Sequence, residues 1–322
     1  METVTDLKLP RIGIGCNAFG ARIDADRVAE IVDAAIEHGA AFFDTADVYG
    51  FGASEELLGA ALRGRRDAVI VATKFGMDVQ GINGPGSVIE GGRRGSAAYV
   101  RASVDASLRR LGIDHIDLYQ FHTPDRETPI DETLGALNEL VEAGKVRAIG
   151  CSNLRAWEVV DADWRARNAG TARFVTAQNE YSLYNRSAED ELLPACVSLD
   201  VGVLPYFPLA YGLLTGKYHR GAAAPEGSRL SGQAQARRLE LADWDRIEAL
   251  QQFADDRDLA LLQVALGGLA AQPAVASVIA GVTTPEQVAA NVEAGAWTPT
   301  PDELAELNAL NPKKPNYATY AS

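Results

Sequence analysis

The sequence is poor in cysteine and in basic residues, and it has no long apolar segment. Its three cysteines, Cys16, Cys151 and Cys196, have neither CxxC spacing nor the spacing of a metal site, so we predict no bound metal. An odd number of cysteines in a chain of 322 residues does not indicate a disulfide framework. We therefore expect a reducing, cytoplasmic environment.

Two further absences argue against membrane and nucleic-acid partners. The chain does not begin with a basic segment followed by an apolar run, and no apolar stretch approaches the ~20 residues that span a bilayer. Lys and Arg number 30 against 44 Asp and Glu, so the formal net charge is −14 at pH 7. A field of that sign repels phosphate backbones and anionic membrane surfaces. We expect a soluble protein.

What the chain does contain is a regular alternation of strand and helix patterns. Apolar residues make up 47% of it, enough for a large core, and its length fits one large domain or two ordinary ones. Segments with helical spacing, such as 28–36 and 100–111, separate the apolar, β-branched runs. Eight strands are predicted: Ile12–Cys16, Ala41–Asp44, Val69–Thr73, Ile116–Phe121, Val146–Gly150, Phe174–Gln178, Val201–Pro205 and Val275–Ile279.

Strict alternation of this kind predicts parallel strands joined by crossovers. Eight units match a (β/α)8 barrel with its active site at the C-terminal ends of the strands, whereas a doubly wound sheet would have fewer strands and a second domain. No Pro- or Ser-rich linker divides the chain, and Gly13, Gly15 and Gly20 do not fit GxGxxG. We predict that residues 1–322 form a single barrel domain.

Two long connections, 76–96 and 207–243, would leave the C-terminal ends of the third and seventh strands. The first is rich in glycine, and the second precedes the next clear helical pattern. Loops of this length at this face usually cover a ligand, although surface decoration without function is the alternative.

Polar residues stand at the C-terminal ends of successive strands. Asp44 ends the second strand and leads to Tyr49, Lys74 ends the third, and His122 ends the fourth. Taken singly, Asp44 could cap a turn, Lys74 could lie in solvent, and His122 could belong to a turn. A barrel would bring all of them to one mouth. The later strands add further polar residues there: Ser152, Asn153, Gln178, Asn179, Glu180 and Tyr206.

Asp44, Tyr49, Lys74 and His122 form a chemically coherent set. A tyrosine hydroxyl titrates near ~10, and a nearby ammonium lowers that pKa, so Lys74 can assist Tyr49. A buried lysine needs a carboxylate partner, which Asp44 provides, and His122 can hydrogen-bond a substrate oxygen. No activated nucleophile accompanies them. The set therefore indicates proton donation to a developing alkoxide, with electrons from a cofactor.

Three segments resemble the aldo-keto reductase superfamily: 43–50 its DTAxxYG element, 73–76 its lysine segment, and 116–125 its histidine segment. The resemblance runs from Arg11 to Asn291. It implies that Asp44, Tyr49, Lys74 and His122 form the catalytic tetrad. The same branch of the superfamily includes potassium-channel β subunits.

The resemblance also implies a nicotinamide cofactor. The matching segments are 150–153, 178–181, 206–217 and 280–291, together with the arginine of Gly-Ser-Arg-Leu. They place cofactor contacts at Ser152, Asn153, Gln178, Tyr206, Phe207, Leu209, Gly212, Lys217, Arg229, Gly281, Thr283, Gln287 and Asn291.

The choice of cofactor depends on departures from the family pattern. Phe207 replaces the usual serine, and Gly281 and Gln287 stand where many relatives carry Lys and Arg. Lys217 and Arg229 still offer two cations to phosphate groups. We expect NADPH (NADP+) to be preferred by a modest margin, with NADH as an alternative.

The leading functional hypothesis is an enzyme that reduces the carbonyl of a small aldehyde or ketone. The alternatives are a cofactor-binding regulatory module like the channel β subunits, and an enzyme that works in the direction of alcohol or sugar oxidation. The sequence predicts neither the particular substrate nor the oligomeric state. Aromatic residues just after strands are candidates for the substrate wall, or else for core packing: Phe19, Phe51, Phe75, Phe121, Tyr181 and Tyr184.

Overall fold

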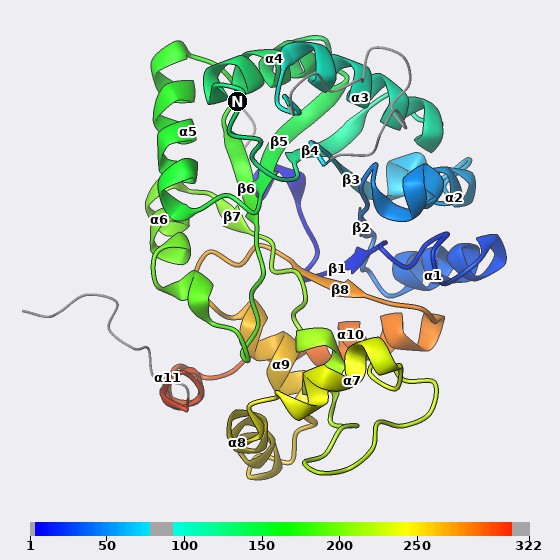
Figure 1. Cartoon of the computed structure of the whole chain (residues 1–322), viewed down its shortest axis with the longest axis vertical. Helices are drawn as coiled ribbons and strands as arrows, with labels where there is room; N and C mark the ends of the chain where they lie inside the picture. The colour runs from blue at the N-terminus through cyan, green and yellow to red at the C-terminus, as the bar shows by residue number, and fades with distance from the viewer. Residues whose placement is uncertain (1–3, 78–92, 311–322) are drawn as a thin grey trace, which may run out of the picture.

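The computed structural model describes residues 4–77 and 93–310 (Figure 1). Within these ranges the chain alternates between parallel strands and helices, as its sequence pattern predicts. The strands are β1 (Ile12–Gly15), β2 (Phe42–Asp44), β3 (Ile70–Phe75), β4 (Ile116–Phe121), β5 (Val146–Ser152), β6 (Phe174–Gln178), β7 (Gly202–Val203) and β8 (Val278–Gly281).

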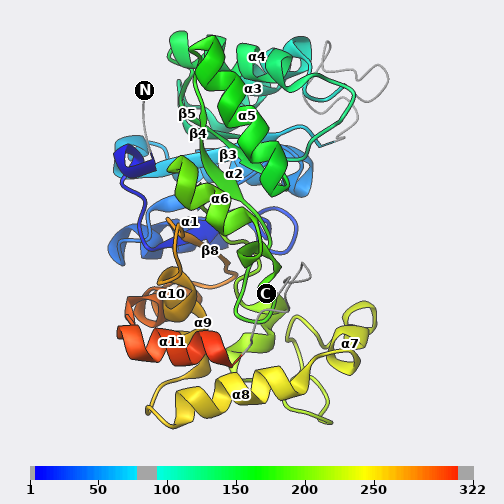
Figure 2. The same cartoon turned by 90° about the vertical axis from the view of Figure 1, so that its left-hand side faces the viewer.

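The helices lie outside the ring of strands in Figure 1, and Figure 2 shows α7, α8 and α11 at the end of the molecule opposite α4. The α-helices are α1 (Ala25–Glu37), α2 (Ala53–Ala61), α3 (Ala97–Leu111), α4 (Ile130–Glu142), α5 (Ala156–Ala169), α6 (Leu192–Leu199), α7 (Gln233–Glu240), α8 (Trp244–Asp255), α9 (Leu261–Ala270), α10 (Pro285–Ala296) and α11 (Pro301–Ala309). The 3-10 helices are η1 (Val4–Leu7), η2 (Tyr49–Gly52), η3 (Arg66–Ala68), η4 (Ser187–Glu189) and η5 (Ala210–Thr215).

The strands form one parallel sheet in the order β7-β6-β5-β4-β3-β2-β1-β8. Its two edges are joined just before β8, where the Val203 amide donates to the Ala274 carbonyl at 2.7 Å and the Ala276 amide donates to the Val203 carbonyl at 2.9 Å. The sheet therefore closes into the (β/α)8 barrel that was predicted. Because the 274–276 segment makes this bridge, β8 begins three residues later than expected.

Local sequence accounts for the helix boundaries. Asp24 caps α1, its carboxylate accepting from the Arg27 amide at 3.1 Å, and Thr284 caps α10 just before Pro285. Gly112 ends α3 with φ of 63°, a left-handed conformation that glycine adopts without strain. Caps of this kind position the turns between helices and strands, and therefore the ends of the strands.

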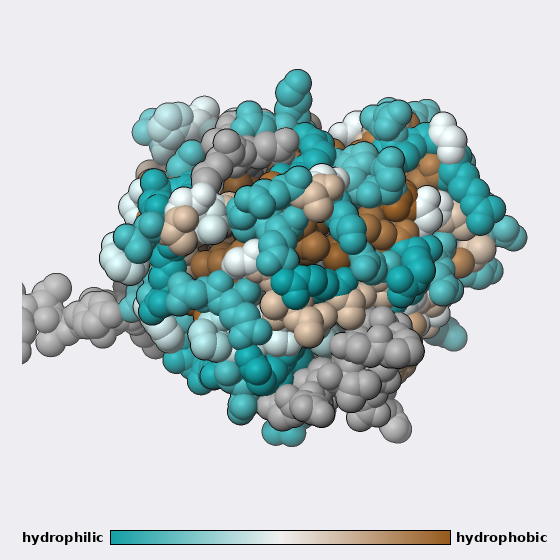
Figure 3. Space-filling model, turned by 90° about the horizontal axis from the view of Figure 1, so that it is seen from above, coloured by the Kyte–Doolittle hydropathy of each residue, from teal (hydrophilic) through white to brown (hydrophobic). Residues whose placement is uncertain are grey.

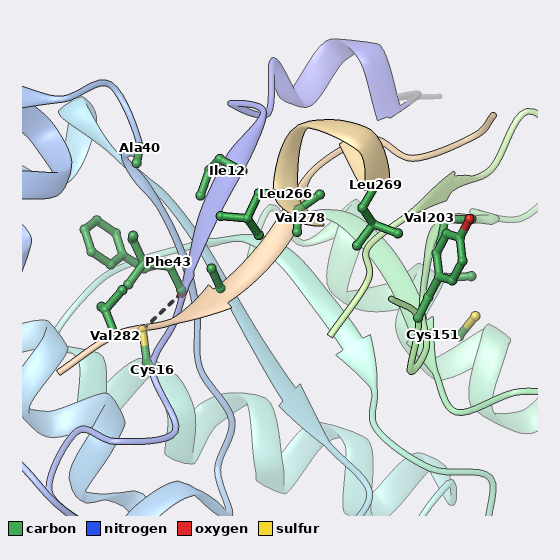
Figure 4. Close-up of a cluster of buried hydrophobic side chains, with 14 of the residues drawn as sticks. Ile12, Cys16, Ala40, Phe43, Cys151, Val203, Leu266, Leu269, Val278 and Val282 are labelled. Carbon is green, nitrogen blue, oxygen red and sulfur yellow. Dashed lines mark hydrogen bonds between the residues drawn. The ribbon is translucent and has the colours of Figure 1, made fainter. Parts of the chain in front are cut away.

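The apolar core has an inner and an outer part. One side chain from nearly every strand fills the barrel interior, and Leu7 of η1 packs with them; the buried set is Leu7, Phe42, Ala72, Leu118, Ala148, Val175, Leu204 and Ile279. The outer part lies between strands and helices, where Leu266 and Leu269 of α9 lie beside Val278 of β8 (Figure 4). The barrel is thus a packed core and not a channel.

Of the two long connections, the second differs from expectation. Residues 78–92 of the first lie outside the described residues. The second, 207–243, contains η5 and α7, so the expectation of a helix-free segment is wrong. The α7 sequence consists mostly of good helix formers, such as Arg237 and Leu239, which explains the helix although it has few apolar residues.

Figure 3 shows one face on which hydrophilic side chains dominate and apolar ones occupy the hollows between them. Among the described helices, none is both long and apolar enough to cross a membrane.

Two helical glycines lead to opposite predictions for stability. A methyl group at Gly59 in α2 would overlap the carbonyl oxygen of Leu111 in α3, whereas one at Gly135 in α4 would meet no atom within 4 Å. Overpacking costs about 1–3 kcal/mol, and alanine is favoured over glycine in helices by about 0.5–1 kcal/mol. Gly59→Ala should therefore lower the free energy of unfolding in urea and Gly135→Ala should raise it. Equal effects of the two substitutions would contradict the close α2–α3 packing.

Candidate active site

A cavity of about 950 Å³ opens at the C-terminal ends of the strands. Asp44, Tyr49 and His122 line it, and so does every residue for which the sequence predicts a cofactor contact, from Ser152 to Asn291. Lys74 lies just behind this surface and is fully buried. The fold therefore brings together residues that are far apart in the chain.

Asp44 and Lys74 form a buried ion pair at the base of the cavity. The Lys74 Nζ donates to Asp44 Oδ2 at 2.6 Å and to the Thr45 carbonyl at 2.9 Å. Burial alone would lower the pKa of Lys74, but Asp44 and then Tyr49 more than offset it, so that pKa lies above its usual value. Lys74 is therefore a charged ammonium, as the sequence argument requires.

Tyr49 stands at the start of η2, where its hydroxyl is 3.4 Å from Lys74 Nζ. The left-handed backbone of Gly50 and Phe51, with φ of 58° and 55°, turns the chain sharply after it. Lys74 lowers the pKa of Tyr49, as expected. The net shift is nevertheless upward, because burial of the phenol outweighs the ammonium. The expectation of a lowered pKa is thus wrong, and Tyr49 holds its proton at neutral pH.

His122 follows β4, and its amide donates to the Phe75 carbonyl at 2.7 Å. Burial, reinforced by the charge of Lys74, lowers the pKa of His122 to about 3. Its ring meets the ring of Tyr49 edge-on, with centroids 6.0 Å apart. Within the described part of the chain its Nδ1 has no hydrogen-bond partner. His122 is a neutral imidazole beside the phenol, able to donate one hydrogen bond and accept another.

Gln120 in β4 is a site residue that sequence reasoning missed. Its Nε2 donates to Asp44 Oδ1 at 2.9 Å, and Gln178 Nε2 donates to the same oxygen at 3.0 Å. The signal was present, because a glutamine stands in a strand that is otherwise rich in apolar residues and is buried throughout. A buried polar side chain needs a partner, and here the partner is the Asp44 carboxylate.

One wall of the cavity is held by hydrogen bonds between the ends of β4, β5 and β7. Asn153 Nδ2 donates to the His122 carbonyl at 3.0 Å and to Ser152 Oγ at 3.1 Å. The Tyr206 hydroxyl donates to Asn153 Oδ1 at 2.8 Å. Asn153 is left-handed, with φ of 59°, a conformation that asparagine tolerates. These hydrogen bonds tie the ends of the three strands together.

The wall formed by the segment after β7 carries aromatic rings and cations. The rings of Phe207 and Tyr211 lie 4.3 Å apart, and the Arg229 guanidinium is 5.5 Å and 5.2 Å from their respective centroids. Phe207 thus supplies a ring face to a cation. Burial, and then the nearby charge of Arg22, lowers the pKa of Arg229.

Three cations line the same cavity, and its one lining carboxylate among the described residues, Asp44, is paired with Lys74. Among the described residues, Arg22, Lys217 and Arg229 form no ion pair. Arg22 lies on the turn after β1 and was not predicted, because that turn has no sequence periodicity. Like charges that converge on one cavity favour an anionic ligand, so the phosphate groups of a dinucleotide fit here.

At the far end, the cavity meets the first turn of α10. Gln287 Oε1 accepts from the Thr283 amide at 2.8 Å and from its hydroxyl at 3.2 Å. Gly281 and Asn291 line the cavity beside them. The N-terminus of a helix attracts anions, but the absence of a basic side chain here leaves only polar groups and the helix itself.

The aromatic candidates for the substrate wall lie elsewhere. Phe19, Phe75, Phe121 and Tyr181 are buried in the outer hydrophobic core, so core packing describes them better than substrate contact. The Tyr181 hydroxyl donates to Glu189 Oε1 at 2.7 Å. Phe51, by contrast, is 82% exposed.

Tyr184, the remaining aromatic candidate, lines a neighbouring pocket with Tyr211 and Arg238. It is therefore adjacent to the central cavity without forming its wall.

Comparisons with known proteins agree over most of the chain. Residues 11–312 match the Aldo/keto reductase family. An uncharacterized oxidoreductase of Bacillus subtilis (strain 168), YrpG, is 36% identical over 320 residues, which is 96% of this chain and 94% of that protein. The versiconal hemiacetal acetate reductase of Aspergillus parasiticus is 32% identical over 324 residues, with coverage of 94% and 93%.

The similarity also extends to a probable voltage-gated potassium channel subunit beta of Arabidopsis thaliana, 32% identical over 323 residues and 96% of each chain. Among solved structures, the holo form of aldo-keto reductase AKR11C1 from Bacillus halodurans superimposes with a TM-score of 0.74 at 31% identity. That match covers 94% of this chain and 92% of the other.

The neutral state of His122 leads to a prediction for stability against pH. An unfolded histidine titrates near ~6.5 and the folded one near 3. Between these values the unfolded chain binds a proton that the folded protein excludes, so stability falls as pH falls. The advantage of wild type over His122→Asn in free energy of unfolding should shrink by about 1 kcal/mol per pH unit between about pH 6 and 4.

Urea denaturation at several pH values measures this difference. His38→Asn, which removes an exposed histidine, is the matched control. A curve for His122→Asn that runs parallel to that of wild type would show that folding does not lower the pKa of His122.

Proposed function

This chain belongs to the aldo/keto reductase family of oxidoreductases, and from that premise we propose that it reduces a small aldehyde or ketone to an alcohol with NAD(P)H, Tyr49 donating the proton. The observation that carries the proposal is the contact of Tyr49 with the buried Asp44–Lys74 pair, at a cavity lined by unpaired cations. We also propose that residues 1–322 act as one barrel domain.

The residues of the cavity suit a nicotinamide dinucleotide, which would supply the hydride when bound. Ser152, Asn153 and Gln178 would face its carboxamide, and Tyr206 would offer a ring face to the nicotinamide. The cations Lys217 and Arg229 would bind its phosphates, and the first turn of α10 its adenosine end. Leu209 and Gly212 would complete the wall beside them.

The side chains of this protein would carry the proton chemistry. His122 would donate a hydrogen bond to the carbonyl oxygen and hold it near the Tyr49 hydroxyl. The neutral phenol would give its proton to the oxygen as negative charge develops there, and Lys74 would stabilise the phenolate that remains. Asp44 would keep Lys74 charged. The raised pKa of Tyr49 ensures that the donor is protonated at neutral pH.

Two alternatives use the same site. A cofactor-binding regulatory subunit is one, because relatives at 32% identity are named as probable channel β subunits. Oxidation of an alcohol or sugar is the other, and the same residues would catalyse it. The Aspergillus relative, which is named a reductase, favours reduction. A panel of carbonyl compounds tested with NADPH, beside one of alcohols and sugars tested with NADP+, would distinguish these functions.

Removal of the Tyr49 hydroxyl tests the proton donor. Tyr49→Phe should lower kcat for carbonyl reduction by about 10²–10⁴-fold, because a general acid contributes by that factor in the transition state. The Kd for NADPH should change little. Tyr119→Phe is the matched control, since Tyr119 is buried in β4 and does not line the cavity. A near-normal kcat for Tyr49→Phe would overturn the assignment.

The choice between NADPH and NADH is tested at Arg229. If its guanidinium binds the 2′-phosphate, Arg229→Ala should raise the Kd for NADPH about ten- to a hundredfold and that for NADH far less. Arg220→Ala removes an exposed arginine that pairs with Glu248, and it should alter neither Kd. Equal losses for both cofactors would place Arg229 on the pyrophosphate, and tighter binding of NADH by the wild type would contradict the preference itself.

A further inference from the structure

Three polar side chains form one layer of the barrel interior at its C-terminal end. They are Asp44 of β2, Gln120 of β4 and Gln178 of β6, all buried. Alternate strands of a barrel contribute to the same layer, which is why these three meet. Gln178 Nε2 lies 3.0 Å from Asp44 Oδ1 and 3.3 Å from Gln120 Oε1, so the three groups close a triangle of hydrogen bonds.

The chemistry of this triangle fixes which way each amide faces. A carboxylate paired with an ammonium only accepts hydrogen bonds, so both glutamines must turn their NH2 groups toward Asp44. The carbonyl oxygen of Gln120 then faces the NH2 group of Gln178 and accepts from it. With its NH2 group used twice, Gln178 keeps its carbonyl oxygen free of these contacts. Gln178 lines the cavity, whereas Gln120 does not.

We propose that Gln120 is a positioning residue that orients the amide of Gln178, so that its carbonyl oxygen accepts a hydrogen bond from the carboxamide NH2 of the cofactor. This inference rests on the proposed function. Asp44 would then hold two groups in place: the Lys74 ammonium, which assists the proton donor, and the Gln178 amide, which binds the carboxamide. Without the oxygen of Gln120, the Gln178 amide loses one of the two acceptors that fix its direction.

The test compares two ligands that differ only at the carboxamide. NADP+ carries the NH2 donor, and its 3-acetylpyridine analogue carries a methyl group in that place. Wild-type protein should bind NADP+ more tightly than the analogue by about three- to tenfold, the value of one hydrogen bond. Gln120→Met removes the polar groups at similar side-chain length. The substitution should raise the Kd for NADP+ and leave that for the analogue unchanged, so the ratio of the two Kd values should approach one. Isothermal titration calorimetry would measure both values.

Two further variants separate positioning from support of the fold. Gln178→Met should give the same ratio as Gln120→Met, and the double variant should lose nothing more, because both act on one hydrogen bond. Gln120→Glu places a carboxyl group beside the Asp44 carboxylate, which favours its protonated form. The protonated group donates to Asp44 and keeps an oxygen that accepts from Gln178, so the ratio should remain that of wild type even if kcat falls. Tyr119→Phe, in the same strand, should leave the ratio unchanged.

The outcomes distinguish this inference from the function on which it rests. Equal weakening of both ligands by Gln120→Met, or an unchanged ratio, would mean that Gln120 only supports the fold and would overturn the inference. A ratio close to one in Gln120→Glu would also overturn the inference. That variant provides the test if Gln120→Met fails to fold. If wild-type protein binds neither NADP+ nor NAD+, the proposed function itself fails.

Discussion

The site depends on one buried ion pair, in which Asp44 and Lys74 lie 2.6 Å apart with almost no exposed surface. Removal of either partner would leave an uncompensated charge in the barrel, at a cost of about 3–5 kcal/mol. Neighbouring groups make the further hydrogen bonds that the two charged side chains require. The Thr45 carbonyl accepts from the ammonium, and two glutamine amides donate to the carboxylate. Tyr49 and His122 therefore lie near an ammonium, that of Lys74, which two hydrogen bonds hold in place.

The barrel interior has an apolar part and a polar part, as β2 and β4 show. In β4, Leu118 belongs to the inner apolar cluster and Gln120 to the polar layer, two residues farther along the same face. In β2, Phe42 and Asp44 repeat this arrangement. Packing of the apolar part fixes the register of the strands. That register brings the side chains of Gln120 and Gln178, on different strands, to the Asp44 carboxylate. Stability and chemistry therefore come from successive layers of one fold.

Much of this could be predicted, since strand and helix periods determine the barrel and the polar strand ends indicate that Asp44, Tyr49, Lys74 and His122 come together. The errors also have physical causes. Successive residues of a strand face opposite sides, so with Lys74 pointing inward Phe75 must face the helices. That alternation, applied fully, would have placed Phe75 in the core and Gln120 in the site. Arg22 and the upward shift in the pKa of Tyr49 depend on turn geometry and burial, which no local pattern reveals.

The wall after β7 holds Phe207 and Tyr211 in left-handed backbone, with φ of 52° and 61°. Each such residue costs about 1–2 kcal/mol, which glycine would avoid. Their rings, however, are the surfaces on which Arg229 lies. Thermal stability and the contact of these rings with Arg229 therefore place opposite demands on the sequence of this segment. Directed evolution for heat resistance alone would enrich glycine here and remove the rings that hold the guanidinium.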